Sequence, residues 1–413
     1  MRVRIETLEA FRRRALRQRG VTLDPAVVDH ARAAIAAVRR RGDAAVLREV
    51  RRFDRREARQ ADLWVDVRAL RAAARRCSPA LKSAIDHAYA SVASFHRRQR
   101  PRAVTWSGRG FRTSLVPEPL DRVGGCVPRG AGSYPSTVLM VGVPARLAGV
   151  RELVLASPMP RDGSLDPALA YAAAKVGASG LYRAGGAAAV AALAYGTSSV
   201  GRVDKIVGPG NAYTAAAKWL VSADVGIDSL AGPSELVVMA SGDADAAAIV
   251  LDLEAQAEHG AGAFAALLCD DDAMLTTVAR ALDAVGAPPG AIGLYRFPSL
   301  DAAMQAAAEA APEHLSLAGG AAARLASRAR NAGAVFVGSR SAVAFGDYVA
   351  GSNHVLPTGG TARWASGLRV DDLVRWTTRV RATGDLARAA AAGAILARHE
   401  GMRYHAASME LRA

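Results

Sequence analysis

Two patterns of apolar and polar positions divide this chain of 413 residues. Up to about residue 113, apolar side chains recur at helical spacing, which predicts helices over residues 25–41, 42–53 and 79–100. From Val123 onward, short continuous runs of Val, Leu and Ile alternate with alanine-rich helical segments. Continuous apolar runs of this kind are typical of parallel strands that are buried on both faces. The sequence therefore indicates a helical first part followed by an α/β protein.

The predicted strands fall into two sets, with glycine- and proline-rich turns between them. The first set covers residues 138–143, 152–156, 180–182 and 205–207, and the second covers residues 236–240, 264–268 and 333–337. Two such sets predict two α/β domains, and the chain is long enough for two sizeable cores. Roughly the last 40 residues return to a helical pattern. We expect them to form an appendage.

The most informative polar feature is the segment 253–259, which ends an apolar helical run with Gln256 and His259. Positions i and i+3 share one helix face, so the Gln256 carbonyl and the His259 imidazole could converge on one cation. Alone, such a pair is usually just a solvated helix face. Further acids and imidazoles follow in the same half of the chain, at Glu313, His314, Asp347, His354, Glu400 and His405. This concentration indicates an active site.

The surroundings of these residues suggest separate roles. Glu313 and His314 follow Pro312, which can begin a helix, and adjacent Glu and His could serve two proton-transfer roles. Asp347 and His354 are expected in loops, where ligands tend to lie. Glu400 and His405 are five residues apart, roughly 140° around a continuous helix. They therefore need either a helix break at Gly401 or a site that straddles the helix.

One set of these groups suits a divalent cation. Gln256, His259, Asp347 and His405 would supply one formal negative charge and leave the ion with residual positive charge. Nitrogen and oxygen ligands of this kind suit Zn²⁺ acting as a Lewis acid or substrate template. The three cysteines, Cys77, Cys126 and Cys269, are widely spaced and indicate neither disulfides nor a thiolate zinc site. Cys269 is expected in a core.

Two glycine turns could hold phosphates at helix N-termini. Gly185-Gly186 and Gly208-Pro-Gly-Asn211 each follow a predicted strand and open a helix, which would present backbone N–H groups to a pyrophosphate. Neither is a complete Gly-x-Gly-x-x-Gly, because Tyr213 stands at the third glycine position of the second turn. Glycine used for turn geometry alone is an equal alternative. Ser234, just before a predicted strand, could bind substrate or belong to an ordinary turn.

The charge of +15 leaves the choice of partner open. Only four of the 53 basic residues are lysine, a skew that resembles the drift of a GC-rich genome. The densest arginines lie in helical segments without interleaved aromatics, which favours an anionic cofactor over nucleic acid. No run approaches 18 apolar residues, so no transmembrane helix is expected. The first residues carry no apolar signal core, and we expect a cytoplasmic protein.

Eight motifs in register resemble those of the histidinol dehydrogenase family, over about residues 123–412. They are Pro135-Ser-Thr-Val-Leu-Met140, Gly208-Pro-Gly-Asn211, Ala231-Gly-Pro-Ser-Glu235, Gln256-Ala-Glu-His259, Ala311-Pro-Glu-His-Leu315, Gly346-Asp-Tyr348, Asn353-His-Val-Leu-Pro-Thr358 and Glu400-Gly-Met-Arg-Tyr-His405. The resemblance implies an α/β fold of two incomplete Rossmann-like domains with parallel-sheet cores, plus small helical N- and C-terminal pieces. The implied division is 1–22, then 23–125 together with 234–368 for the larger catalytic domain, 126–233 for the NAD-binding domain, and 369–413.

The same resemblance implies a homodimeric, zinc- and NAD-dependent enzyme that binds no nucleic acid and no membrane. It would oxidise L-histidinol through L-histidinaldehyde to L-histidine, the last steps of histidine biosynthesis, with one Zn²⁺ per subunit. The implied zinc ligands are Gln256, His259, Asp347 and His405, the proton-transfer residues are Glu313 and His314, and the further substrate contacts are Ser234, His354 and Glu400. Glu400 and His405 would come from the partner subunit.

The chain departs from the family where NAD is expected. Cys126 replaces a usual tyrosine and Ala188 a usual glutamine, whereas Asn211, the third cofactor-binding position, is retained. We expect NAD to bind more weakly, with Arg129 able to compensate through a phosphate contact. Two alternatives stay open: a paralogue that oxidises another polar alcohol, such as a sulfonated diol, and a basic nucleic-acid-binding protein that has lost catalysis.

Overall fold

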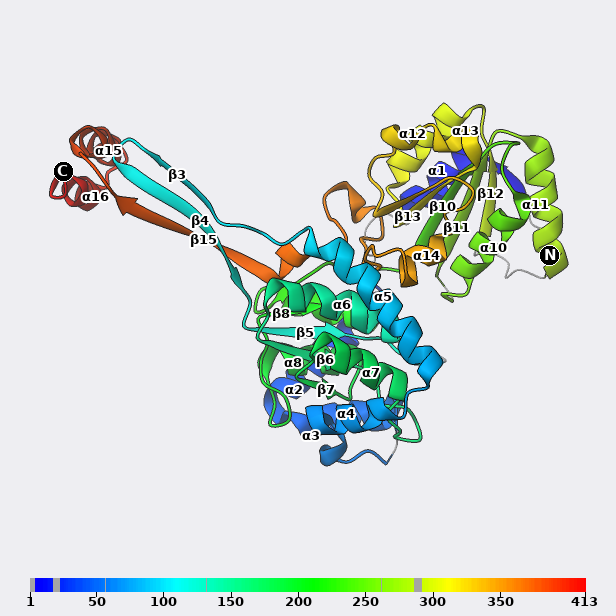
Figure 1. Ribbon diagram of the computed structural model, residues 1–413, viewed down its shortest axis with the longest axis horizontal. Coiled ribbons are helices and arrows are strands. Elements are labelled where there is room, and N and C mark those ends of the chain that lie inside the picture. Colours follow the sequence, from blue (N-terminus) through cyan, green and yellow to red (C-terminus); the bar gives the residue numbers. More distant parts are fainter. Residues whose placement is uncertain (1–3, 18–22, 56, 131, 261, 286–291) are drawn as a thin grey trace.

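The computed structural model describes residues 4–17, 23–55, 57–130, 132–260, 262–285 and 292–413. Two α/β units lie next to each other, and a long arm leads away from them to the C-terminus (Figure 1). Each unit is built on a six-stranded sheet, and the arm contains a third sheet of three strands. The predicted α/β class with two parallel-sheet cores is confirmed.

The first unit is built on what we call the A sheet, whose strands are all parallel. Their order is β1 (Ile5–Thr7), β12 (Ile292–Arg296), β11 (Phe264–Cys269), β10 (Glu235–Ala240), β13 (His314–Ala318) and β14 (Ala334–Val337). α10 (Ala246–Ala257) and α11 (Asp272–Val285) cover one face, and α1 (Leu8–Arg17), α12 (Leu300–Ala310) and α13 (Gly319–Ala323) cover the other. α14 (Val343–Tyr348) packs near α10.

The second unit is built on the B sheet. Its order is β2 (Trp64–Asp66), β7 (Gly180–Tyr182), β6 (Glu152–Ala156), β5 (Arg122–Cys126), β8 (Lys205–Val207) and β9 (Gly226–Ile227), with only β2 antiparallel to its neighbour. One face carries α2 (Pro25–Arg41), α3 (Asp43–Phe53), α8 (Gly186–Tyr195) and α9 (Ala212–Val221). The other carries α4 (Val67–Arg75), α5 (Pro79–Arg97), α6 (Pro135–Ala148) and α7 (Pro167–Val176).

The arm consists of β3 (Val104–Gly108), β4 (Phe111–Pro119) and β15 (Val374–Ala382), followed by α15 (Ala387–His399) and α16 (Arg403–Glu410). The strands pair antiparallel in the order β15-β4-β3. Most side chains of β3 and β15 are exposed, and the helix pair has only a small core of Ala394, Ala397 and Ala406. An exposed ribbon with so little core of its own is typical of a segment that packs on another molecule.

Side-chain caps explain where several helices begin. Asp24 and Asp166 accept backbone N–H groups at the first turns of α2 and α7, and each precedes a proline at the first helical position. Ser78 does the same for α5, and Asp245 for α10. These groups satisfy N–H donors that have no partner inside the helix. The predicted helices 25–41 and 42–53 are confirmed within a residue, and 79–100 ends at Arg97.

One predicted strand is wrong. Residues 138–143 lie inside α6, which begins with Pro135 and carries Pro144 within it. Nearly the whole helix is buried between the B sheet and α5 and α7, so its apolar side chains surround it on every side. A helix of this kind has no polar stripe, and its sequence cannot be told from that of a buried strand by periodicity. The other six predicted strands are present.

The grouping of residues 23–125 with 234–368 is also corrected. α2 and α3 pack on α8 and α9 through small side chains such as Ala31 and Ala34, and β2 pairs with β7, so this segment builds the second unit. The A sheet instead recruits the N-terminal piece, because β1 pairs with β12. Neither the first part nor the C-terminal piece is purely helical, since both contribute strands to the arm. Among the described residues, no helix is long and apolar enough to cross a membrane.

Candidate active site

The amino ends of two neighbouring strands bring three predicted site residues together. Ser234 directly precedes β10, Glu313 directly precedes β13, and His314 is the first residue of β13. The strands are parallel neighbours in which Leu236 pairs with His314, so their starts lie at one edge of the A sheet. The expected helix start at Pro312 is therefore wrong, because the residues that follow it form a central strand.

The carboxylate of Glu313 is fixed through one oxygen. Its Oε2 accepts hydrogen bonds from the Ser234 hydroxyl at 2.7 Å and from the Glu235 backbone N–H at 2.9 Å. The side chain is buried, which strengthens both bonds. The other oxygen, Oε1, takes no part in these two contacts. Glu313 is thus held in one orientation while one of its oxygens can serve a ligand.

The imidazole of His314 is oriented through Nδ1, which lies 3.1 Å from the backbone carbonyl oxygen of Glu235. A carbonyl oxygen can only accept, so Nδ1 carries the proton of the neutral ring. Glu313 Oε2 lies 3.5 Å from the same nitrogen and stabilises the ring if it becomes charged. The lone pair of Nε2 is left to accept a proton, which is the geometry of a general base.

Glu235 connects the starts of β10 and β13 with the loop at Gly359, although the sequence analysis gave it no role. Its Oε1 accepts the Gly359 N–H at 2.9 Å and its Oε2 accepts the Glu313 N–H at 3.3 Å. Burial, and to a smaller extent the charge of Glu313, raises the pKa of Glu235 to about 7, although the hydrogen bonds from the Gly359 and Glu313 N–H groups oppose the rise. The signal was available, because Glu235 follows Ser234 within one of the quoted motifs.

The imidazole of His354 interacts with several other predicted site residues. Burial lowers the pKa of His354, the Asp347 charge raises it, and His314 and His259 lower it, so all three residues act on this ring. Nδ1 lies 3.0 Å from the Asp347 carbonyl oxygen, and Nε2 lies 3.1 Å from the Thr137 hydroxyl. Asp347 lies in the last turn of α14 and not in the expected loop, whereas His354 is in a loop as predicted.

Gln256 supplies the test of whether these residues fit a metal. It is 3% exposed near the end of α10, and its amide Nε2 is buried with no hydrogen-bond partner in the described part of the chain. An unpaired buried amide indicates a place for a ligand, and turning the amide puts Oε1 at that position. His259 follows in the turn after α10. An amide oxygen, an imidazole and the Asp347 carboxylate form a donor set that fits zinc.

The remaining predicted residues lie on the arm. α15 ends at His399, Gly401 has φ of 78°, and α16 begins at Arg403, so of the two alternatives the structure has the helix break at Gly401. Glu400 and His405 are both exposed. Figure 1 places α15 and α16 far from the A sheet, so a single chain does not bring them to Glu313. Within the described ranges of this chain, no three His, Cys, Asp or Glu side chains form a metal-binding group.

Predicted NAD-binding positions lie at the carboxyl ends of B-sheet strands, where Cys126 ends β5 and Asn211 follows β8. The chain runs from β5 through β6 to β7 on one side and from β8 to β9 on the other, so the strand order reverses between β5 and β8. Dinucleotides bind at such a reversal. Gly208 follows β8 with φ of 101°, and a Cβ there would stand 2.4 Å from the Cys126 carbonyl oxygen. Only glycine at position 208 lets the turn after β8 come this close to the end of β5, and this close approach fits a binding site for a cofactor.

The three predicted cofactor positions differ in exposure. Asn211 is exposed and caps α9, where its side-chain oxygen accepts the Thr214 N–H at 3.1 Å. Cys126 is 7% exposed and Ala188 is 2% exposed. Burial raises the pKa of the Cys126 thiol to about 11, so it is neutral. Among the residues that the structure describes, the side chain of Cys126 forms no hydrogen bond, and Ala188 has no polar side-chain atom, so the weaker NAD binding stays a prediction.

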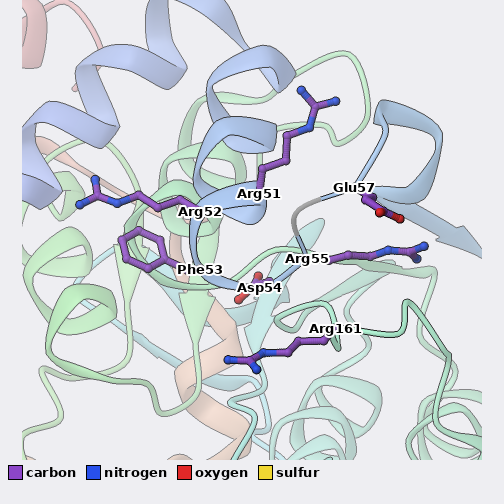
Figure 2. A pocket seen from close by; sticks show the side chains of 7 residues that line it. All are labelled: Arg51, Arg52, Phe53, Asp54, Arg55, Glu57 and Arg161. Carbon is purple, nitrogen blue, oxygen red and sulfur yellow. The ribbon is translucent and has the colours of Figure 1, made fainter.

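Two polar features of the B unit were not predicted. Lys218 is 2% exposed and pairs with the buried carboxylate of Asp228, which also accepts the Gly208 N–H at 2.7 Å. The Lys218–Asp228 pair therefore fixes the position of the Gly208 turn. The second feature is a cavity of about 440 Å³ beside the same edge (Figure 2). It is lined by Arg51, Arg52, Phe53, Asp54, Arg55, Glu57 and Arg161.

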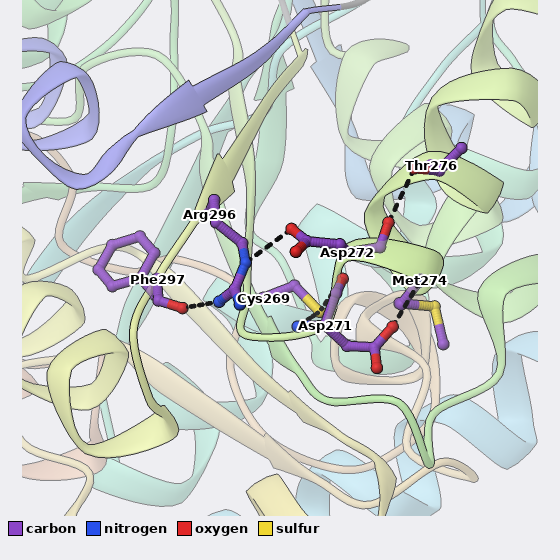
Figure 3. A network of polar contacts seen from close by, with 7 residues as sticks. All are labelled: Cys269, Asp271, Asp272, Met274, Thr276, Arg296 and Phe297. Atoms are coloured by element: carbon purple, nitrogen blue, oxygen red, sulfur yellow. Dashed lines mark hydrogen bonds and ion pairs between the residues drawn. The ribbon is translucent and has the colours of Figure 1, made fainter.

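Cys269 lies at the opposite edge of the A sheet from Glu313. It ends β11 in a network in which Arg296 Nε donates to Asp272 at 2.7 Å and the Asp271 N–H lies 3.4 Å from the Cys269 sulfur (Figure 3). The side chain is 0% exposed, and burial raises its pKa to about 11. The prediction that Cys269 is a core residue is confirmed, and its neutral thiol is no nucleophile.

Comparison with known proteins gives one consistent result. A sequence model of the histidinol dehydrogenase family matches residues 17–413. The histidinol dehydrogenase of Moorella thermoacetica is 44% identical over 94% of both chains, and that of Gluconobacter oxydans is 42% identical over 94% of this chain and 93% of its own. The crystal structure of histidinol dehydrogenase from Elizabethkingia anophelis is similar with a TM-score of 0.90 at 30% identity, covering 100% of this chain and 98% of that chain.

Proposed function

The chain belongs to the histidinol dehydrogenase family, an NAD-dependent group of oxidoreductases in histidine biosynthesis, and from this premise we propose how its residues divide the work. L-Histidinol is oxidised through L-histidinaldehyde to L-histidine at the edge of the A sheet that carries Ser234, Glu313 and His314. The observation that carries the proposal is the fixed Glu313–His314 pair, whose two side chains are oriented by Ser234 and Glu235.

His314 is the proton acceptor of the first step. Its Nδ1 proton is directed at the Glu235 carbonyl, so Nε2 accepts the hydroxyl proton of the alcohol as a hydride leaves the same carbon for NAD. The positive charge that then develops on the ring lies 3.5 Å from Glu313 Oε2. The nearby carboxylate stabilises that charge.

Glu313 acts on water in the second half of the reaction. Because Oε2 is engaged by two donors, Oε1 is the oxygen available to take a proton from a water molecule that adds to the aldehyde carbon. His314 returns its proton to the aldehyde oxygen as the water adds, and the neutral ring then removes a hydroxyl proton of the hydrate as a second hydride leaves for a second NAD. One alcohol thus yields one acid and two NADH, with its four electrons accounted for.

Gln256, His259, Asp347 and, from the other subunit, His405 are the proposed zinc ligands. Zinc would supply a Lewis acid and a template that fixes the carbinol of the substrate. Ser234, His354 and Glu400 would contact the substrate. A homodimer follows from this assignment, because the exposed Glu400 and His405 can reach an A-sheet edge only from another chain. NAD would extend from Asn211 at the B-sheet edge, and we place the enzyme in the cytoplasm.

The test is the stoichiometry of NADH formed per L-histidinol consumed by zinc-loaded protein. The proposal expects two NADH per substrate, and loss of turnover after chelation that zinc restores. A yield of one NADH per substrate contradicts the double oxidation. Absence of turnover with L-histidinol, together with turnover of a sulfonated diol, would establish the paralogue instead.

A further inference from the structure

Residues 353–359, which we call the bridging segment, contact both α/β units. At its start, Asn353 is buried, and its Nδ2 donates to the Met140 carbonyl oxygen on α6 at 2.7 Å. At its end, the Gly359 N–H donates to Glu235 Oε1 at 2.9 Å, at the amino edge of the A sheet. The bridging segment is therefore anchored on the B unit at one end and on the A sheet at the other.

A buried histidine supports the B-unit end of the bridging segment. His96 on α5 is 0% exposed, and its Nε2 lies 3.3 Å from the amide nitrogen of Asn353. An amide nitrogen only donates, so Nε2 accepts, and Nδ1 carries the proton that it shares with Gln99 Oε1 at 2.8 Å. The Asn353 amide thus donates one hydrogen to a backbone carbonyl and the other to an imidazole. This buried network fixes the start of the segment before any ligand binds.

The ring of His354 is held between the two units by both of its nitrogens. Nδ1 lies 3.0 Å from the carbonyl oxygen of Asp347 on α14, which can only accept, so Nδ1 carries the proton. Nε2 of the neutral ring is then an acceptor, and the Thr137 hydroxyl on α6 donates to it at 3.1 Å. The ring cannot turn or change tautomer without losing a hydrogen bond. It offers a substrate its face and its carbon edge, and it takes no proton in the reaction.

Thr137 lies beside the edge where the B unit is expected to hold the dinucleotide. It is the third residue of α6, the helix that follows β5, and it is 3% exposed. Val141 lies one turn further along the same helix face, and a Cβ added at Gly208 would stand 3.2 Å from its Cγ2. The Thr137 hydroxyl therefore connects the expected cofactor edge with a ring that lies near His314 and His259.

We propose that Thr137 is a positioning residue for hydride transfer, because its hydroxyl fixes His354 and so aligns the alcohol beside that ring with the nicotinamide. The inference rests on the proposed function, which puts the alcohol at the A-sheet edge and NAD at the B-sheet edge. Reacting atoms must be about 3–3.5 Å apart and aligned, and a displacement of about 1 Å can cost roughly 10²-fold in rate. A hydrogen bond between the two units acts on this alignment. Thr137 acts only through His354.

NMR of zinc-loaded protein with ¹⁵N-labelled histidine tests the contact without turnover. The Nε2 resonance of His354 is assigned by its loss in His354→Gln. Thr137→Val keeps the shape of the side chain and removes the hydroxyl, so this resonance should move downfield, to the position of an acceptor without a donor. In Thr137→Ser, which keeps the hydroxyl, it should stay close to the wild-type position. Thr276→Val, whose hydroxyl donates to the Asp272 carbonyl oxygen within α11, is the matched control and should leave the resonance unchanged.

Steady-state kinetics with the alcohol and NAD tests the positioning role. Thr137→Val should lower kcat at least about tenfold, while the KM for NAD stays within about twofold of the wild-type value. The deuterium isotope effect on kcat, with substrate labelled at the carbinol carbon, should rise because misalignment slows hydride transfer relative to the other steps. Thr137→Ser should restore both quantities. A merely structural role would lower the Tm of Thr137→Val without changing the isotope effect.

An unchanged Nε2 resonance in Thr137→Val would overturn the proposal, and so would a moved resonance with wild-type kcat and isotope effect. The proposed function is tested separately, on the wild-type protein. A wild type that oxidises a sulfonated diol and not L-histidinol rejects the proposed function, and a loss of kcat in Thr137→Val on that diol would retain the inference. Two NADH per L-histidinol with no effect of Thr137→Val would do the reverse. A wild type that oxidises neither alcohol rejects both.

Discussion

Replacing Glu235 by glutamine should change how the stability of the protein depends on pH. The side chain is 8% exposed, accepts two backbone hydrogen bonds and lies against the Glu313 carboxylate. Its pKa in the folded protein is about 7, above the ordinary 4.5, chiefly because burial disfavours the charge. Glutamine keeps the shape of the side chain and removes the charge at every pH.

The sign and size of the effect follow from that difference in pKa. A carboxyl with a raised folded pKa contributes stability below about pH 4.5, and that contribution is lost as the pH rises through about 7. At about 1.36 kcal/mol per pKa unit, the loss approaches roughly 3 kcal/mol by pH 8. The wild-type protein should therefore lose stability relative to Glu235→Gln by this order between pH 5 and pH 8.

Urea unfolding of both proteins at fixed protein concentration, in half-unit steps from pH 5 to pH 8, measures this. The absolute offset between the proteins is not the readout, because the amide NH₂ of glutamine would face a backbone donor and destabilise the variant at every pH. The readout is the change of that offset with pH. Glu9→Gln, at an exposed surface pair, is the control and should parallel the wild type. Parallel curves for Glu235→Gln would refute a raised pKa.

Two further substitutions test the cofactor edge. Gly208→Ala puts a Cβ 2.4 Å from the Cys126 carbonyl oxygen at φ of 101°. The KM for NAD should therefore rise at least about tenfold, while the KM for L-histidinol changes little. An unchanged KM for NAD in steady-state kinetics would contradict the role of this turn in binding the cofactor. Lys218→Met leaves the buried Asp228 charge unpaired and should cost about 3–5 kcal/mol in urea unfolding, and adding Asp228→Asn should recover part of that loss. A single variant as stable as the wild type would show that the pair is not structural.

How much of the fold the sequence predicts depends on how each element is buried. Six strands of the two sheets were predictable because continuous apolar runs between glycine turns are typical of them, whereas β13 was missed because Glu313 and His314, at its start, are polar. α6 was not predictable, because a helix that is buried all round has the same apolar sequence as a buried strand. The arm was missed for the opposite reason. Side chains such as Arg375 and Arg381 on β15 are exposed, so no alternation of apolar and polar positions marks the strand.

The candidate site shows a similar division. Glu313, His314 and Ser234 were predicted as site residues, but their convergence depends on which strands are neighbours, and a linear sequence does not contain that information. The tautomer of His314 depends on a backbone carbonyl, which no residue type encodes. Glu235 was overlooked because a glutamate at the start of a strand is usually solvated, whereas the 353–359 loop buries this one.

The central claim is that one active site takes residues from two chains, and mixed dimers test it most directly. Glu313→Gln and His405→Asn chains with different affinity tags are co-expressed, and the heterodimer is purified by both tags in turn. If His405 serves the partner's Glu313, the heterodimer has one intact site and should regain about half of wild-type turnover, although each parent homodimer is nearly inactive. A heterodimer no more active than its parents would place both residues in the same site of one chain and contradict the account.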